Sequence, residues 1–173
     1  SSLLLRIGSY DERLLRALMA RRRPLLDVFM RGITRFADWP VAVLLTLLML
    51  GGFVPGLEAV GVRIAWTLAV SHIFVQILKR IFSRERPRFE PGLNWLVTVP
   101  DRFSFPSGHA TAGMSIALPL ALALPGLAGP LVLILGVMVG LSRCYLGVHY
   151  PGDVAAGWTL AVTTLAGVVL FGF

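Results

Sequence analysis

Long apolar stretches constrain this chain more than any other feature of its sequence. There are five of them, at residues 39–60, 63–78, 108–124, 130–148 and 154–173. A membrane-spanning helix needs about 20 mostly apolar residues, and only helices or closed barrels satisfy their backbone groups inside lipid. Only 14% of the residues are charged, against about 25% in a typical soluble domain. The sequence therefore excludes a water-soluble domain and predicts an all-α, polytopic membrane bundle of about five transmembrane helices.

The first 38 residues follow another pattern. Two stretches, separated by the Arg-rich run at 21–23, each place apolar residues on one side of a helical wheel: Leu14, Leu15, Leu18 and Met19 in the first, and Leu25, Leu26, Phe29, Met30, Ile33 and Phe36 in the second. Such patterns are typical of amphipathic helices that lie in the membrane interface. We therefore expect an interfacial segment at residues 1–38 and a transmembrane bundle at 39–173, within one domain. The chain begins with Ser1, so a removed signal or an additional preceding helix stays open.

Polar residues in a membrane bundle are costly and tend to mark function. The first polar cluster closes the second apolar stretch and contains the only lysine of the chain, Lys79. Lys79 and Arg86 are seven residues apart, or two helical turns, so they share a face if the helix continues. A basic anchor at the membrane edge accounts for the other arginines of the cluster, Arg80, Arg84 and Arg88. It accounts less well for the pairing of the single lysine with Arg86.

The second polar cluster opens the third apolar stretch with Ser107, Gly108 and His109. Ser107 suits the N-cap of a helix, and Gly108 lets another group approach the backbone. A helix start presents unpaired N–H groups and the positive end of a dipole, which together attract anions. His109 in that position can donate a proton to an oxygen that leaves the anion. By itself, an ordinary capping turn with an interfacial histidine is the simpler interpretation.

The third polar cluster joins the fourth and fifth apolar stretches. Pro151 suits the first turn of a helix, and if that turn is helical, His149 and Asp153 can meet. A carboxylate on one imidazole nitrogen fixes the tautomer and leaves the other nitrogen free to attack. Arg143, which follows Ser142 near the end of the fourth stretch, is one short loop away. An interfacial histidine and a carboxylate that faces the helix dipole are the simpler alternative.

Alternating spans bring the three clusters to one membrane face, where the second and fourth stretches end and the third and fifth begin. Three fixed cations, a helix N-terminus and two histidines make a site for a phosphate-like dianion, with one histidine as nucleophile and one as acid. The sequence has no carboxylate cluster suited to Mg²⁺, which disfavours metal-dependent transfer. The candidate site residues are Lys79, Arg86, Ser107, Gly108, His109, Arg143, His149 and Asp153.

Together, the three clusters resemble the signature of the type 2 phosphatidic acid phosphatase, or lipid phosphate phosphatase, superfamily. The matching patterns are K-x6-R-P from Lys79, P-S-G-H ending at His109, and S-R-x5-H-x3-D ending at Asp153. The resemblance implies a hydrolase that acts on a lipid phosphomonoester or pyrophosphate. Bacterial membrane members act on phosphatidylglycerol phosphate, phosphatidic acid or undecaprenyl pyrophosphate, and related members on lipid A phosphates or polyprenyl-linked sugar phosphates.

The resemblance also implies a role for each site residue. His149 attacks phosphorus to form a phosphohistidine, Asp153 orients it, and His109 protonates the leaving group and then activates water. The phosphoryl oxygens are held by Lys79, Arg86, Ser107, the Gly108 backbone and Arg143. The family mechanism needs no metal and no cofactor. The expected partners are a lipid phosphate substrate and membrane lipids, with no nucleic acid and no obligate protein partner.

Other functions fit parts of the sequence. A phosphohistidine can pass its phosphate to a lipid acceptor, which would make the protein a phosphotransferase. Vanadium-dependent haloperoxidases share the residue set, but so hydrophobic a chain favours a lipid substrate. A non-enzymatic scaffold that attracts anionic lipids would leave the motif spacing unexplained. Nucleic-acid binding, suggested by the net charge of +7, lacks a recognition motif.

Two arguments on membrane sidedness disagree. The candidate site lies on the face with most of the arginines, and the positive-inside rule places such a face in the cytoplasm. Members of the resembled family usually have the site outside, and many have six spans. Several of these cations are needed to bind phosphate, so counting them overstates the topology signal of this face. We therefore expect a bacterial inner-membrane protein whose site faces the periplasm or exterior.

The connection at 88–104 is rich in apolar and aromatic residues, which favour the membrane interface. It either flanks a lateral entry for lipid chains or packs over the bundle. The residues concerned are Phe89, Leu93, Trp95, Leu96, Val97 and Phe103.

Overall fold

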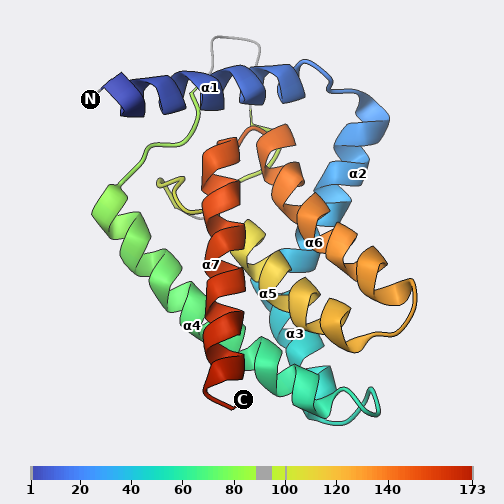
Figure 1. Cartoon of the computed structure of the whole chain (residues 1–173). Helices are drawn as coiled ribbons and strands as arrows, with labels where there is room; N and C mark the ends of the chain where they lie inside the picture. Colours follow the sequence, from blue (N-terminus) through green and yellow to red (C-terminus); the bar gives the residue numbers. More distant parts are fainter. Residues whose placement is uncertain (1, 89–94, 100, 173) are drawn as a thin grey trace.

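The computed structural model describes residues 2–88, 95–99 and 101–172, with side chains from residue 9 onward. It confirms the all-helical prediction (Figure 1). In chain order, the elements are α1 Ser2–Met19, α2 Pro24–Thr34, the short 3-10 helix η1 Arg35–Ala37, α3 Trp39–Leu50, α4 Glu58–Phe82, α5 Gly108–Ala123, α6 Ala128–Tyr145 and α7 Pro151–Leu170. Phe89 and Leu93 of the 88–104 connection lie outside the described residues.

Three of these helices, α4, α6 and α7, are long and apolar enough to cross a membrane. The stretch Pro24–Ala37 and helix α3 pass the same test only together, as a pair bent by 52°. Helix α5 is apolar but has 16 residues, which reach about 24 Å at 1.5 Å per residue. The described residues thus provide three spans, or four with the bent pair, and the predicted count of five stays a prediction.

The first predicted stretch, at residues 39–60, is wrong as a single element. Helix α3 ends and α4 begins on either side of a turn at 51–57. Glycine permits the left-handed backbone that this reversal uses, with φ of 72° at Gly52 and 83° at Gly56. Hydropathy alone hides the turn because apolar residues continue through it.

The second predicted stretch, at 63–78, is part of a longer helix. Helix α4 has 25 residues and carries Lys79 in its last turn. It does not continue to Arg86, because Ser83 adopts a left-handed conformation with φ of 45° and ends the helix. Arg86 therefore reaches the site from the following loop and not from the helix face of Lys79.

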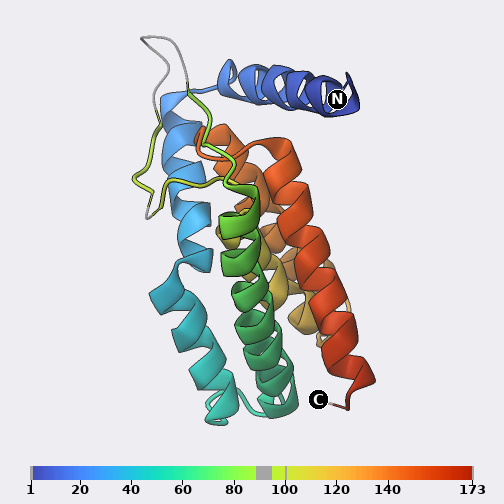
Figure 2. The ribbon, with the colours of Figure 1, turned by 90° about the vertical axis from the view of Figure 1, so that its left-hand side faces the viewer.

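Helix α5 lies at the centre of the bundle, between α4, α6 and α7 (Figures 1 and 2). Small residues allow this close packing, as is usual between membrane helices. A Cβ on Gly136 of α6 would lie 2.5 Å from the Cβ of Ala117 on α5. A Cβ on Gly140 would lie 2.5 Å from the ring of Trp158 on α7. Larger side chains at these glycines would separate the helices that carry the site.

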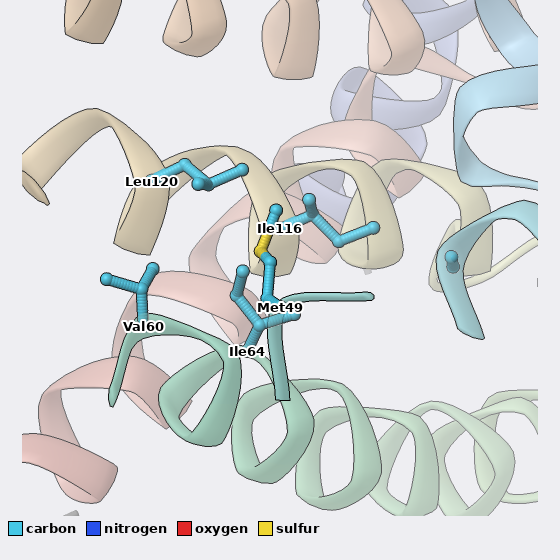
Figure 3. Packing of buried hydrophobic residues seen from close by; sticks show 6 residues of the cluster. Met49, Val60, Ile64, Ile116 and Leu120 are labelled. Atoms are coloured by element: carbon cyan, nitrogen blue, oxygen red, sulfur yellow. The ribbon is translucent and has the colours of Figure 1, made fainter. Parts of the chain in front are cut away.

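Buried apolar side chains join α3, α4 and α5 at the end of the bundle where α3 ends and α4 begins (Figure 3). The labelled members of this core are Met49, Val60, Ile64, Ile116 and Leu120. The core fixes α4 against α5. The opposite ends of the two helices therefore hold their polar residues at constant separation.

Helix α1 lies across the other end of the bundle (Figure 2). Leu15 and Met19 are buried there, against residues at the ends of α5, α6 and α7, namely Ala110, Cys144 and Val154. In the 88–104 connection, Leu96 and Val97 pack on a small core formed by Tyr145, Leu146 and Val148. This contact fits the alternative in which the connection packs over the bundle.

Candidate active site

The predicted site residues meet at the end of the bundle that α1 covers. A cavity of about 170 Å³ opens there, and both candidate histidines, His109 and His149, line it. The two rings therefore border one space. The cavity is also lined by Lys79, Arg86, Gly108 and Arg143. Ser107 and Asp153 do not line it and are fully buried.

His149 is held between an arginine and a carboxylate. Nη1 of Arg86 lies 3.1 Å from Nε2 of His149, and because arginine can only donate, Nε2 accepts. The ring proton is then on Nδ1, which lies 3.6 Å from Oδ2 of Asp153. That separation exceeds a normal hydrogen bond, and Nδ1 has no hydrogen-bond partner among the described residues. In this tautomer, Nε2 carries the lone pair.

His149 is also kept neutral. The residue is 2% exposed, and burial lowers the pKa of His149 to about 3. Asp153 opposes this shift, whereas the positive charges of Arg86 and Arg143 add to it. An imidazole attacks phosphorus through an unprotonated nitrogen, so the nucleophilic form is present throughout the neutral pH range.

Asp153 is fixed through both of its oxygens. Oδ2 accepts from the backbone N–H of Tyr150 at 2.9 Å, and Oδ1 accepts from Arg84 at 2.8 Å. Arg84 also donates to Asp11 of α1 at 2.8 Å, and its guanidinium lies 4.0 Å from the ring centroid of Tyr150. Burial opposes the shift, but Asp153 and Asp11 raise the pKa of Arg84. The interpretation of Arg84 as a membrane anchor is therefore wrong: it connects α1 to the carboxylate beside His149.

Asp11 also contacts the first turn of α7. Its Oδ1 accepts from the backbone N–H of Gly152 at 2.8 Å. A Cβ on Gly152 would lie 2.8 Å from Oδ2 of the same carboxylate. A glycine at this position thus lets α1 reach the residue directly before Asp153.

Asp101 occupies the cationic side of the cavity. Its Oδ1 lies 3.1 Å from Nζ of Lys79 and 2.8 Å from Nη2 of Arg86. Burial opposes the shift, but Lys79 and Arg86 hold the pKa of Asp101 below its usual range, so the group is ionised at neutral pH. A phosphate dianion competes with this carboxylate for the same two cations. Asp101 is not among the residues predicted from the sequence, where its only signal is an acidic residue between two cationic motifs.

Arg143 enters the cavity from the last turn of α6. Its Nη1 donates to Oγ1 of Thr34 on α2 at 2.8 Å. Its Nε is buried and has no hydrogen-bond partner among the described residues. A buried donor without an acceptor costs about 1–3 kcal/mol, and a phosphate oxygen in the cavity would supply the acceptor.

His109 stands in the first turn of α5 and is oriented by a second carboxylate. Its Nε2 lies 3.0 Å from Oδ1 of Asp38. Asp38 separates η1 from α3, at the break of the bent pair. Asp38 could not be predicted from the sequence, because it precedes His109 by 71 residues and belongs to no motif.

The start of α5 presents backbone donors to the cavity. The side chain of Ser107 caps the helix and accepts from the N–H of Ala110 at 3.4 Å. A Cβ on Gly108 would meet only Val75 and His72, at 3.8 and 3.9 Å. Packing does not require glycine here. The missing side chain instead leaves the helix start open to an anion.

Two larger hollows adjoin the cavity. An apolar groove of about 510 Å³ runs between α3 and α4 and shares Trp39, His72 and Gln76 with the cavity. A more polar pocket of about 590 Å³ shares Trp39, His109 and Arg143 with it. An apolar groove that begins at a cationic cavity suits a molecule with an anionic head and an apolar chain.

No group of three or more His, Cys, Asp or Glu side chains in the described part of the chain is placed to hold a metal ion. The positive charge offered to an anion comes from the side chains themselves, above all Lys79, Arg86 and Arg143.

Known proteins are similar to this chain in sequence. The PAP2 superfamily model matches residues 60–173, which contain all the candidate site residues. The chain is 36% identical to decaprenylphosphoryl-5-phosphoribose phosphatase of Mycobacterium tuberculosis over 146 residues, 82% of this chain and 77% of the relative. It is 30% identical to phosphatidylglycerophosphatase B of Bacillus subtilis over 167 residues, 90% of this chain and 80% of the relative.

Known proteins also share the fold. A crystal structure of a transmembrane PAP2 type phosphatidylglycerolphosphate phosphatase from Bacillus subtilis matches with a TM-score of 0.78 and 29% identity, over 95% of this chain and 85% of that one. Fold and site thus define an integral membrane protein with a histidine- and arginine-lined cavity at one end of a helical bundle. The chain belongs to the PAP2 superfamily.

Proposed function

We propose that this protein is a lipid phosphate phosphatase, which hydrolyses a phosphomonoester or pyrophosphate of a membrane lipid. The observation that carries the proposal is the neutral His149 among three cations, in a cavity from which an apolar groove leads away. The relatives support it, since they are named as phosphatases of decaprenylphosphoryl-5-phosphoribose and of phosphatidylglycerophosphate. Phosphatidic acid, polyprenyl pyrophosphates and lipid A phosphates belong to the same chemical class.

In the first step, Nε2 of His149 attacks phosphorus, forming a P–N bond while the P–O bond to the lipid breaks. Nη1 of Arg86, which lies 3.1 Å from Nε2 in the free protein, releases this nitrogen and donates to a phosphoryl oxygen instead. Asp153 balances the positive charge that develops on the ring. His109, held by Asp38, donates a proton to the leaving lipid oxygen.

The phosphoryl oxygens are stabilised where negative charge develops. Lys79, Arg86 and Arg143 supply the charge, and the capped start of α5 at Ser107 and Gly108 supplies a backbone N–H. Asp101 gives up its contacts with Lys79 and Arg86 to the phosphate.

In the second step, His109 takes a proton from water, and the water oxygen attacks phosphorus. The P–N bond breaks, inorganic phosphate leaves, and Nε2 of His149 recovers its lone pair. Arg84 and Asp11 act as positioning residues, because Arg84 binds Oδ1 of Asp153, while Oδ2 lies beside His149, and Asp11 in turn binds Arg84.

For the whole chain, we propose five spans formed by α3 to α7, with residues 1–38 at the interface. Helix α1, which lies across the end of the bundle, supports an interfacial position for the first part of this segment (Figure 2). Helix α3 has only 12 residues and is long enough to span only together with residues 24–37, so the span that contains α3 includes this stretch. We propose further that the site faces the periplasm or exterior of a bacterial inner membrane. The burial of Lys79, Arg86 and Arg143 in the site supports this placement, because these cations are not free to act as topology signals.

The proposed function is tested with purified protein in neutral detergent, with EDTA present and no acceptor added. We expect inorganic phosphate to be released from at least one of phosphatidic acid, phosphatidylglycerophosphate and undecaprenyl pyrophosphate. Release without an acceptor distinguishes hydrolysis from phosphotransfer. His149→Ala should lower turnover by at least about a hundredfold, whereas His72→Ala, at a cavity histidine outside the mechanism, should keep most of it.

Two results would contradict this proposal. Near-normal activity of His149→Ala, with contaminating phosphatase excluded, would remove the assigned nucleophile. Activity that disappears with EDTA and returns with Mg²⁺ would contradict a mechanism based on side-chain cations.

A further inference from the structure

The polar pocket beside the reaction cavity carries two arginines that the mechanism does not use. Arg31 of α2 and Arg35 of η1 line this pocket, together with Asp38 and part of the 88–104 connection. The two arginines are four residues apart on a nearly continuous helical stretch, so they project from one face. The pocket therefore places two more cations beside the histidine that is proposed to protonate the leaving group.

These two cations are not neutralised by the protein. Neither the Arg31 nor the Arg35 side chain forms a hydrogen bond or ion pair with any residue that the structure describes. The one acidic side chain of the pocket, Asp38, is engaged with His109 at 3.0 Å. Nε of Arg143, which borders the same pocket, is buried and has no partner in the described part of the chain. The pocket thus carries an excess of donors and positive charge.

The direction of the reaction leads the substrate into this pocket. In an in-line displacement, the leaving oxygen departs on the side opposite to His149, and in the proposed mechanism it takes its proton from His109. The rest of the substrate therefore passes His109, which lines both the cavity and the polar pocket. Trp39 lines these two spaces and the apolar groove as well. A substrate can place a polar linker in the pocket and its chains in the groove.

We propose that Arg31 and Arg35 bind a second phosphate of the lipid substrate, a phosphodiester joined to the scissile phosphomonoester through a short polyol. The inference rests on the proposed function and narrows its substrate class. Guanidinium groups bind phosphate through paired, charge-assisted hydrogen bonds, which are stronger than neutral ones. A pocket of about 590 Å³ has room for a phosphodiester and a glycerol or sugar linker. A lipid with a single phosphate leaves these arginines unused.

The test compares two lipids in neutral detergent micelles, phosphatidylglycerophosphate with two phosphates and phosphatidic acid with one. For the double variant Arg31→Gln with Arg35→Gln, we expect kcat/KM on phosphatidylglycerophosphate to fall about tenfold or more, mainly through KM. On phosphatidic acid it should stay within about twofold of wild type. Lysine at both positions should restore part of the loss. Arg21→Gln, at an exposed arginine outside the pocket, should change neither substrate.

Three outcomes would overturn the inference. Equal losses on both lipids would assign the arginines to folding or to the scissile phosphate. General attraction of anionic headgroups would be the role of the arginines in either of two cases. In the first, Arg21→Gln lowers kcat/KM as much as the double variant does. In the second, adding phosphatidylglycerol to the micelles enlarges the loss of kcat/KM in the double variant on both lipids. A wild-type protein that releases phosphate from undecaprenyl pyrophosphate but hydrolyses neither of these two lipids would overturn the subsite, while the proposed function stands.

Discussion

At the scale of single residues, the candidate site has charges placed behind the groups to which the proposed mechanism assigns the reaction. Asp38 stands behind His109, and Asp153 stands beside His149. Arg84 in turn binds Asp153 at 2.8 Å and is 30% exposed. Each of these contacts fixes a ring or a carboxylate that has rotational freedom of its own. A residue of this kind should therefore affect the rate of the chemical step more than substrate binding.

Arg84→Gln tests this expectation. The loss of one charged partner of Asp153 should lower kcat about tenfold to a hundredfold, with KM changed less than threefold, because the variant still binds phosphate. Arg84→Lys should recover part of kcat. The matched control is Arg88→Gln, since Arg88 is 80% exposed and contacts only Glu85 among the described residues. Proportional increases in KM, or an equal loss in the control, would contradict a positioning role.

At the scale of elements, small residues determine how closely α5, α6 and α7 pack. One of them is Gly157 of α7, which lies one helical turn after Asp153 and faces the start of α5. A Cβ on Gly157 would lie 2.8 Å from the backbone oxygen of Ser107 and 2.9 Å from Oγ1 of Thr111. Backbone oxygen cannot rotate away as a flexible side chain can. The first turn of α7 would therefore have to move relative to the cavity.

Gly157→Ala should consequently cost about 1–3 kcal/mol of stability and lower the midpoint of thermal unfolding in detergent, together with activity. Gly167→Ala is the matched control on the same helix, because nothing lies within 4 Å of the position of its Cβ. Alanine there should be neutral or slightly stabilising, since it favours helix more than glycine does. If the two variants behave alike, close packing at Gly157 does not position the site.

At the scale of the whole molecule, the site end and the C-terminal end of the bundle lie far apart (Figure 2). Four basic residues at the site end, Lys79, Arg84, Arg86 and Arg143, are held by contacts within the site. The positive-inside rule applies to cations that are free to interact with lipid headgroups and the cytoplasm. Once these four are set aside, the excess of charge on that face is smaller than the sequence alone implies.

We therefore expect the site end to be labelled from outside the cell. The measurement uses a Cys144→Ala background, since Cys144 is the single cysteine, with either Arg88→Cys at the site end or Leu127→Cys at the exposed turn between α5 and α6. An impermeant maleimide should label the first variant in intact cells and the second only after lysis. The reverse pattern would place the site in the cytoplasm.

Periodicity and motif spacing were sufficient for the class of this protein and for most of the side chains that line the cavity. Apolar length predicts membrane helices because lipid leaves a backbone few alternatives. The separations within each motif are short, as for His149 and Asp153, so these side chains stay near one another even where a loop carries one of them, as it does Arg86.

The residues that the sequence analysis missed have partners far along the chain. Arg84 and Asp11 are 73 residues apart, and Asp38 and His109 are 71 residues apart. Asp101 reaches Lys79 and Arg86 from a connection without a regular pattern. The sequence by itself thus determined the membrane class and the candidate site residues, which depend on composition and local geometry. Only the tertiary structure decided which carboxylates hold those groups and which spaces adjoin them, because such pairings depend on how separate helices pack.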